Sequence, residues 1–161
     1  MSTLYIMCGI PGSGKSYFAR NCLNADVVVS RDIIRYSMIG DRDKYFDHER
    51  EVFDQFVRIL AHHLQHFNTV VADATHINIY SRRKLTAAID KIYSDYRIVY
   101  VVCAPSLQVC LYRNNKRTGR ELVPEKIVKE MHEKFTAPVF DGYKLEDKRA
   151  VGIWWINGEP I

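Results

Sequence analysis

Residues 9–16, with the sequence GIPGSGKS, combine glycines, a lysine and a serine in a pattern suited to binding a polyphosphate. Glycines let the backbone turn so that successive N–H groups point inward at an anion, and a following helix N-terminus adds a favourable dipole. The lysine would pair with the β- and γ-phosphates, and the serine hydroxyl would ligate Mg²⁺. An apolar run at 4–8 precedes the loop and a helical pattern at 15–23 follows it, as this motif requires. We therefore expect ATP and Mg²⁺ to bind at Gly9, Gly12, Ser13, Gly14, Lys15 and Ser16, with Ser16 as the metal ligand.

Asp32 is the first candidate for chemistry beyond binding. It follows the apolar run 27–29, at the carboxyl edge where α/β sheets bind ligands. Transfer of a phosphoryl group needs an acceptor that loses a proton as it attacks, and Asp32 would face the phosphate loop across the crevice. Arg35 would share its helix face and bind a phosphate of the acceptor. In the alternative interpretation, Asp32 is an ordinary helix cap and Arg35 a solvated charge.

The stretch TVVADATHIN at 69–78 offers a second group of polar side chains. Asp73 ends an apolar run, in the position of the acidic residue that stands near Mg²⁺ in nucleotide-binding loops. We expect Asp73, Thr75 and His76 to line the acceptor site. The alternatives are that His76 only faces water and that Asn78 only caps the next helix.

The segment 111–124, LYRNNKRTGRELVP, concentrates positive charge on a helix end and a glycine-containing loop. We expect it to close over the triphosphate as a lid, with Arg117 and Arg120 at the phosphates and one arginine at the transition state. A solvated basic patch is the alternative.

The pattern of apolar residues along the chain predicts the strands and helices that position these residues. Apolar runs at 4–8, 27–29, 69–72, 98–103 and 151–156 are nearly continuous, which is typical of parallel strands covered on both faces. Helical patterns fall between them, at 15–23, 33–39, 48–67, after Asn78, at 106–116 and after Pro124. This alternation predicts an α/β fold with a mainly parallel five-stranded sheet and helices on both faces. We expect 137–150 to be a loop.

Composition predicts an ordinary globular protein with one domain over residues 1–161. The net charge of +4 is compatible with an anionic partner without requiring one. Four cysteines without metal-ligand spacing are expected to be reduced thiols in a cytoplasmic setting. There is no signal-peptide pattern, and the longest apolar stretch, 98–104, is too short to span a bilayer, so we expect no membrane partner.

Four stretches together resemble the kinase half of the bacteriophage polynucleotide kinases: GIPGSGKSYFAR, SRDIIRYSM, DATHIN with an arginine pair at 82–83, and YRNNKRTGRELVP. The likeness continues through APVFDGY at 137–143 and so covers nearly the whole chain. The phosphate loop alone is common to many ATPases, but its conjunction with R-D-x-x-R and the basic segment is more specific. The resemblance implies a P-loop NTPase fold and ATP- and Mg²⁺-dependent phosphorylation of the 5′-hydroxyl of DNA or RNA.

The resemblance also implies roles for single residues. Lys15 and Ser16 would serve the triphosphate and the metal, and Asp32 would be the general base. Arg35 would contact the phosphate of the acceptor strand, and Arg113 would stabilise the transferring group. Lys15, Asp32 and Arg113 are therefore the expected catalytic residues.

The chain departs from the family pattern in two places. The loop after the third strand more often reads D-T-N or D-N-T-N, so the polar role here falls to either Asp73 or Thr75. Where many relatives begin a phosphatase domain with D-x-D-G-T, this chain reads VGIWWING, and we expect no 3′-phosphatase activity. We interpret the tryptophan pair as part of a strand that covers the core rather than as a base-stacking platform.

Two further groups are not assigned a site. His62, His63 and His66 lie opposite the apolar stripe of their helix without a glutamate or cysteine at ligand spacing, and the basic trio at 82–84 is expected on the surface. Two other functions stay open: a kinase of another hydroxyl, such as a nucleoside, a modified DNA base or a small metabolite, and an ATP-binding module or ATPase without an acceptor. The pattern indicates no oligomeric state and no preference between DNA and RNA.

Overall fold

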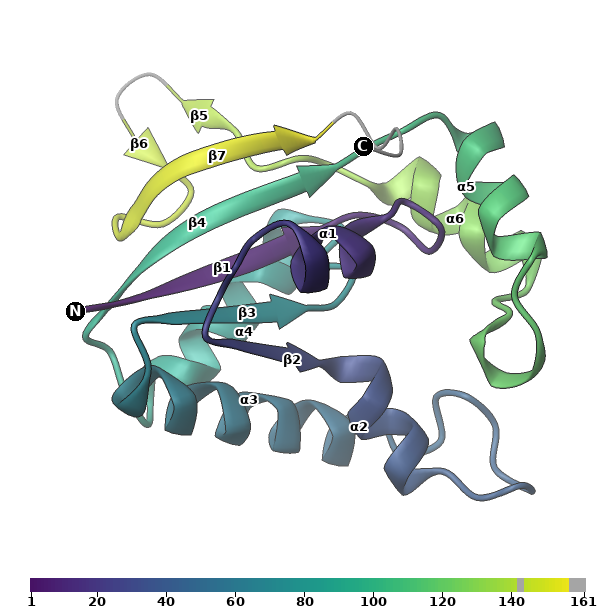
Figure 1. Cartoon of the computed structure of the whole chain (residues 1–161), viewed down its shortest axis with the longest axis horizontal. Helices are drawn as coiled ribbons and strands as arrows, with labels where there is room; N and C mark the ends of the chain where they lie inside the picture. The colour runs from purple at the N-terminus through teal and green to yellow at the C-terminus, as the bar shows by residue number, and fades with distance from the viewer. Residues whose placement is uncertain (142–143, 157–161) are drawn as a thin grey trace.

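The computed structural model describes residues 1–141 and 144–156, so the ends of the APVFDGY and VGIWWING stretches lie outside the described residues. The centre of the fold is one sheet of five parallel strands in the order β2-β3-β1-β4-β7 (Figure 1). The strands are β1 (Ser2–Cys8), β2 (Val27–Ser30), β3 (Thr69–Asp73), β4 (Tyr96–Cys103) and β7 (Ala150–Ile156). All five expected strands form, and the predicted α/β architecture is confirmed.

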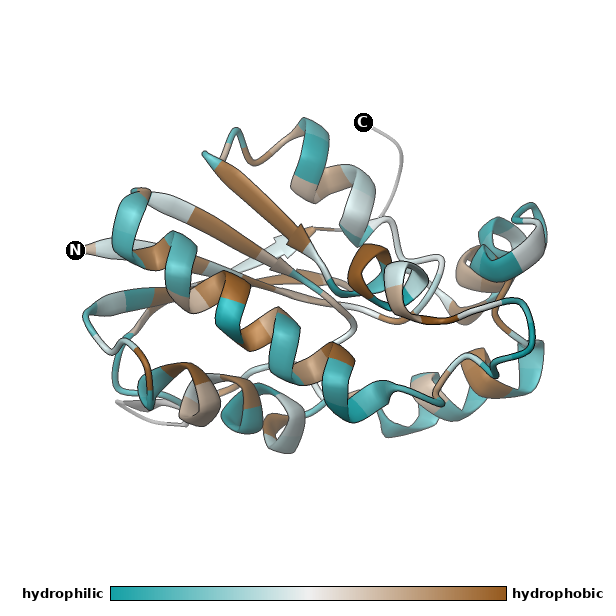
Figure 2. Cartoon of the chain, turned by 90° about the horizontal axis from the view of Figure 1, so that it is seen from below, coloured by the Kyte–Doolittle hydropathy of each residue, from teal (hydrophilic) through white to brown (hydrophobic). Residues whose placement is uncertain are grey.

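Helices cover both faces of this sheet. The helices are α1 (Lys15–Asn21), α2 (Arg31–Met38), α3 (Glu49–His66), α4 (Ile79–Asp90), α5 (Leu107–Asn115) and α6 (Glu125–Lys134), with a 3-10 turn η1 (Gly119–Glu121). Helices α3 and α4 pack in one core cluster with Leu4, Ile6 and Val70, whereas α1 packs on the opposite face with Met7 and Val71. Figure 2 shows the strands mostly brown and α3 alternating brown and teal, as expected for a helix with one face on the core.

The N-terminal caps of α2 and α4 use some of the polar side chains at the carboxyl edge of the sheet and leave others without a capping role. Ser30 caps α2, because its Oγ accepts a hydrogen bond from the Ile33 N–H at 3.4 Å. Asp32 is therefore not the cap, and it lies in the first turn of α2. Asn78 caps α4 in a reciprocal pair with Ser81, as the sequence predicted.

The segment 137–150 is not wholly a loop. It contains two short antiparallel strands, β5 (Phe140–Asp141) and β6 (Lys144–Leu145). Two-residue strands leave no periodicity in a sequence, so the pattern could not reveal them.

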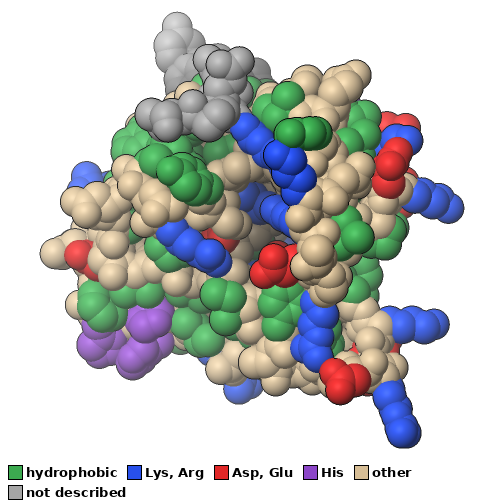
Figure 3. All heavy atoms as spheres, turned by 45° about the vertical axis from the view of Figure 1, so that its right-hand side comes forward, with side chains coloured by type: hydrophobic (Ala, Val, Ile, Leu, Met, Phe, Trp, Pro, Cys, Tyr) green, Lys and Arg blue, Asp and Glu red, His purple; other side chains and the backbone are tan. Residues whose placement is uncertain are grey.

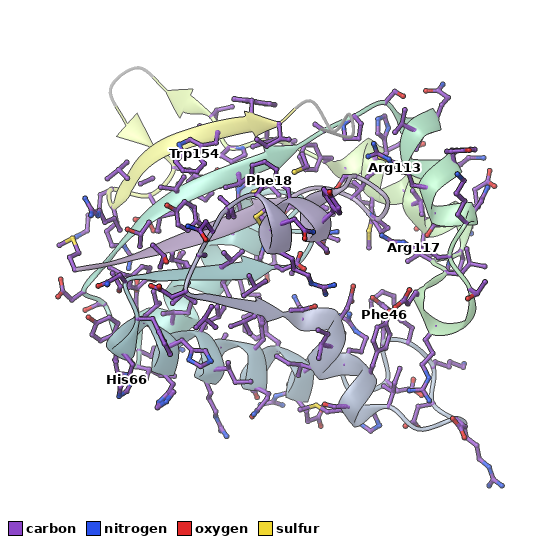
Figure 4. The ribbon with its side chains drawn as sticks, in the orientation of Figure 1. Phe18, Phe46, His66, Arg113, Arg117 and Trp154 are labelled. Atoms are coloured by element: carbon purple, nitrogen blue, oxygen red, sulfur yellow. The ribbon has the colours of Figure 1, made fainter. Side chains whose placement is uncertain are left out.

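The tryptophan pair lies on β7, at the edge of the sheet. The expected strand forms and packs on the core through Ile153 and Ile156, but Trp154 and Trp155 themselves remain 44% and 59% exposed. Trp154, which is labelled on β7 in Figure 4, packs against Tyr5 with the ring centroids 5.4 Å apart. An edge strand has neighbouring atoms on one side only, which leaves these side chains partly in water.

Arg82, expected on the surface, is one of the most deeply buried side chains of the protein. Arg82 and Glu146 form an ion pair in which the side chains are 1% and 2% exposed, with Nη2 donating to Oε2 at 2.9 Å. Nη1 of Arg82 donates to the carbonyls of His76 and Thr136, at 3.0 and 2.9 Å. The pair therefore links α4, the loop after β3 and the C-terminal segment, and only tertiary contacts could show this.

We expect Glu146→Gln to lower the free energy of unfolding by about 3 kcal/mol, because it leaves a buried guanidinium without its counter-charge. Urea unfolding followed by circular dichroism measures this loss. Glu125→Gln is the matched control, since its partner Lys129 is exposed and the pair contributes less than about 1 kcal/mol. Equal effects of the two substitutions would show that the buried pair has no special role in stability.

Within the described ranges, no helix combines the length and the apolar character needed to cross a bilayer.

Candidate active site

The phosphate loop has a backbone that only glycine can adopt at its key positions. Gly12 and Gly14 have φ angles of 81° and 88°, in the left-handed region. A Cβ on Gly12 would lie 2.2 Å from the carbonyl oxygen of Cys110, and one on Gly9 would lie 2.5 Å from Ser13 Oγ. The loop is thus packed against its surroundings, with its shape determined by sterics.

Lys15 and Ser16 begin α1 directly behind this loop. Lys15 is buried, and Ser16 Oγ donates a hydrogen bond to Asp73 Oδ1 at 3.1 Å. Asp73 ends β3, and Ser30 is its partner in the neighbouring strand β2, so the strand ends meet at the site. A hydroxyl and a carboxylate are hard oxygen ligands of the kind that Mg²⁺ prefers, so this pair fits a magnesium ion.

A cavity of about 760 Å³ opens between the phosphate loop, α2 and residues 111–124, the segment expected to act as a lid and called the lid below. Figure 3 shows this hollow, with lysine, arginine and acidic side chains gathered around it. Most of the sequence-predicted site residues meet in its wall: Lys15, Ser16, Asp32, Arg35, Asp73, Thr75, Arg117 and Arg120. Residues distant in the chain are thus brought to one carboxyl edge of the sheet, as the topology of α/β proteins requires.

Asp32 lies in this wall with one carboxylate oxygen engaged. Its Oδ1 accepts hydrogen bonds from the Tyr45 hydroxyl, at 2.7 Å, and from Arg35 Nη1. Among the described residues no hydrogen bond reaches Oδ2. Asp32 is half exposed, with its side chain 51% accessible to solvent.

Arg35 is not the solvated charge of the alternative interpretation, because its side chain is buried and paired. It is only 5% exposed, and its guanidinium is bound by Glu49, Asp32 and Tyr45. Burial and the nearby Asp32 charge raise the pKa of Tyr45 well above its usual range, so its hydroxyl stays protonated and donates to Asp32.

Sequence reasoning missed Tyr45 and Glu49. Tyr45 lies in the 39–48 connection, and Glu49 begins α3, fourteen residues after Arg35. No short-range spacing joins these residues to α2, so only the packing of α3 against α2 reveals them.

The lid arginines divide into two kinds of position. Arg113 Nη1 donates to the Gly12 carbonyl at 3.5 Å, and it lies 3.3 Å from the position that a Cβ on Gly14 would take. Arg113 therefore contacts the phosphate loop, although it does not line the cavity. Arg117 lines the cavity, and Figure 4 shows it on the lid with Phe46 on the opposite side of the opening.

Arg120 contacts the C-terminal end of α2 rather than the phosphate loop. Its Nη2 pairs with Asp41 at 2.9 Å, and its Nη1 donates to the carbonyls of Tyr36 and Ile39 at 3.4 Å. These carbonyls end α2, where a cation is favoured by the helix dipole. Arg120 thus links the lid to α2. The sequence had instead predicted that Arg120 lies at the phosphates of ATP.

We expect Arg120→Ala to free this end of the lid without unfolding the protein. Amide hydrogen exchange at residues 117–122 should accelerate by about tenfold, since a lost contact of roughly 1.4 kcal/mol corresponds to that ratio. Lys126→Ala, which removes a comparably exposed pair with Glu130, serves as the control and should leave the lid exchange unchanged. Unchanged exchange in Arg120→Ala would show that other contacts hold the lid.

His76 is absent from the cavity wall, and the expectation that it binds the acceptor has no support in its position. It is 4% exposed, stacks on Phe56, and bonds through Nδ1 to the Met7 carbonyl at 2.7 Å. Burial lowers the pKa of His76 to about 3, so the ring is neutral and Nδ1 is the donor. His76 therefore joins the loop after β3 to the strand that leads into the phosphate loop.

The histidines of α3 lie away from this cavity. His62 and His66 lie with their ring centroids 4.5 Å apart and their planes tilted by 36°, near the end of α3, where Figure 4 labels His66. Within residues 1–141 and 144–156, no group of three or more His, Cys, Asp and Glu side chains is arranged to hold a metal ion.

Together the parallel sheet, the phosphate loop at its carboxyl edge and the adjoining cavity define a P-loop protein. The chain belongs to the AAA domain family, which matches residues 4–138.

Comparison with curated proteins adds a relative from Methanococcus maripaludis, an L-seryl-tRNA(Sec) kinase, which is 28% identical over 147 residues. The match covers 84% of this chain and 53% of the relative, so the chain spans about half of that protein's length.

Two solved structures are similar. A chain of the Pnkp1/Rnl/Hen1 complex is 26% identical with a TM-score of 0.57, over 70% of this chain and 38% of that one. Chaetomium thermophilum Kti12 in complex with ADP-AlF3 has a TM-score of 0.65 at 11% identity, over 95% of this chain and 88% of that one. At this low identity, the second likeness supports the fold alone.

Proposed function

We propose that this protein transfers the γ-phosphoryl group of ATP to the 5′-hydroxyl end of DNA or RNA. The observation that carries the proposal is the position of Asp32, which lines the same cavity as Lys15 and Ser16 and uses only Oδ1 in its hydrogen bonds to described residues. An alcohol between them would have a base on one side and the triphosphate on the other. The relative from Methanococcus maripaludis is an L-seryl-tRNA(Sec) kinase, which is consistent with an acceptor attached to nucleic acid.

The proposed reaction assigns each residue one task. Asp32 Oδ2 accepts the hydroxyl proton as the acceptor oxygen bonds to the γ-phosphorus and the bond to the β-phosphate oxygen breaks. Lys15 offsets the negative charge on the phosphates, and Arg113, beside Gly12, would reach the migrating group from the lid. Bound Mg²⁺, held through Ser16 with Asp73 behind it, would supply further charge neutralisation.

A second candidate is a kinase of a small hydroxyl compound such as a nucleoside. The cavity residues between 31 and 49 include five carboxylates (Asp32, Asp41, Asp43, Asp47, Glu49) but only three cations (Arg31, Arg35, Lys44). A surface with excess negative charge is less suited to a long polyanion than to an acceptor with little negative charge. This charge balance is the specific observation in favour of the smaller acceptor.

One labelling experiment separates these functions. The purified protein is incubated with γ-labelled ATP and Mg²⁺, and is offered a 5′-hydroxyl oligonucleotide, a 5′-phosphorylated control or free nucleosides. Label that enters only the 5′-hydroxyl strand supports the proposal, whereas label on nucleosides supports the second candidate. Release of free phosphate with every acceptor would indicate an ATPase and contradict both.

A further inference from the structure

The arginines of α2 that face the cavity are already bound by a carboxylate of the protein itself. Arg35 donates from Nε to Glu49 Oε2 at 3.1 Å, and from Nη2 to both carboxylate oxygens at 2.9 Å. Arg31 Nη2 donates to the same Oε1 of Glu49. One carboxylate therefore neutralises much of the positive charge on this side of the cavity.

The rest of the Arg35 guanidinium is also occupied. Nη1 donates to Asp32 Oδ1 and to the Tyr45 hydroxyl, the latter at 2.8 Å. The Tyr45 ring covers one face of the guanidinium, with its centroid 4.4 Å from Cζ. Because a guanidinium has five N–H donors, these contacts leave no pair of donors for the two-point grip in which arginine binds a phosphate.

We propose that Glu49 acts as an internal anion that competes with the phosphate of an acceptor for Arg35, and so determines which acceptors bind well. The part of this inference that concerns nucleotide acceptors rests on the proposed function. A phosphate next to the reactive hydroxyl gains Arg35 only by displacing Glu49. An acceptor without a phosphate leaves the Glu49–Arg35 pair intact and meets no such competition.

Glu49 is suited to this role because it can move without disrupting the core. Its side chain is 32% exposed, and it lies in the first turn of α3, at the end of the 39–48 connection. Arg35, in contrast, is buried and also holds Asp32, so it stays in place when Glu49 is exchanged for a ligand. The competition is thus between two anions for one fixed cation.

Removal of the Glu49 charge tests the proposal through binding, independently of catalysis. Calorimetry is carried out on the full chain with Mg²⁺ and a non-hydrolysable ATP analogue, using a nucleoside 3′-monophosphate and the matching nucleoside as titrants. We expect Glu49→Gln to bind the 3′-monophosphate about tenfold more tightly, as one freed charge-assisted hydrogen-bond pair would allow, and the nucleoside within about twofold of the parent. Glu49→Ala, which places a good helix former in α3, should show a gain in the same direction.

Asp47→Asn is the matched control, because Asp47 lines the same cavity and caps the Lys44 N–H but contacts neither arginine. An equal gain in Asp47→Asn would reduce the effect to general electrostatics, and a gain below about twofold in both Glu49 variants would show that Glu49 does not compete. Either result overturns the inference. Failure of the parent to phosphorylate 5′-hydroxyl ends would instead count against the proposed function, since the binding gain does not depend on transfer.

Discussion

Asp32→Ala should reduce phosphoryl transfer by about 10²–10⁴-fold, the contribution of a positioned general base, while ATP affinity stays within about twofold of the parent. The reason is that Asp32, as proposed, would face the acceptor, with Oδ1 held by Tyr45 and Arg35 and Oδ2 without a hydrogen bond within the described residues. Single-turnover transfer to a 5′-hydroxyl oligonucleotide measures the chemical step, and titration of ATP measures the binding separately.

Two further substitutions sharpen this prediction. Asp32→Asn keeps the size of the side chain and its ability to accept from Tyr45, but an amide cannot accept the proton, so transfer should be lost in the same way. Asp47→Asn removes a carboxylate from the same cavity wall and should retain activity within about threefold, because only general electrostatics change. Full transfer by both Asp32 variants would remove the base assignment, and with it the main support for a transferase.

Lys15→Ala should weaken both ATP binding and transfer. The buried ammonium at the start of α1 is expected to bond to the phosphates, and the loss of one charge-assisted hydrogen bond of about 1.5–3 kcal/mol corresponds to a 10- to 100-fold weaker affinity. Transfer should fall further, by at least about 10²-fold, because the charge that develops in the transition state also loses its partner.

The contrast between these two variants identifies their roles. Arg20→Ala, on the exposed side of the same helix, is the control and should leave both quantities unchanged. Calorimetry with ATP and the single-turnover assay are applied to each variant. ATP affinity equal to the parent in Lys15→Ala would show that the loop does not hold the triphosphate through this side chain.

The conformation of the phosphate loop and its place at the edge of the sheet could be predicted almost completely from the sequence. The shape of the phosphate loop depends on neighbours within eight residues, and its glycines are required by local backbone angles, two of them in the left-handed region. The end of β3 likewise placed Asp73, because a parallel strand directs its carboxyl end to the same edge as its neighbours. These are local rules, so a linear pattern expresses them.

The acceptor half could be predicted only in part. Asp32 and Thr75 reach the cavity as expected, but Tyr45 and Glu49 had no short-range signal. Arg120 lies at the end of α2 instead of at the phosphate loop, and His76 is buried beside Met7 instead of in the wall. In each case the partner is a backbone carbonyl or a side chain from a distant segment.

By itself, therefore, the sequence determined the order of strands and helices, the phosphate loop and the α/β class, because these follow from periodicity, glycine conformation and capping over a few residues. Only the tertiary structure decided which charged groups neutralise one another. The pairs Glu49–Arg35 and Glu146–Arg82 join residues fourteen and sixty-four positions apart, and their side chains leave water only when separate elements pack. Burial and pairing of charge are properties of the assembled fold, and here the Glu49–Arg35 pair sets the charge on the α2 side of the cavity.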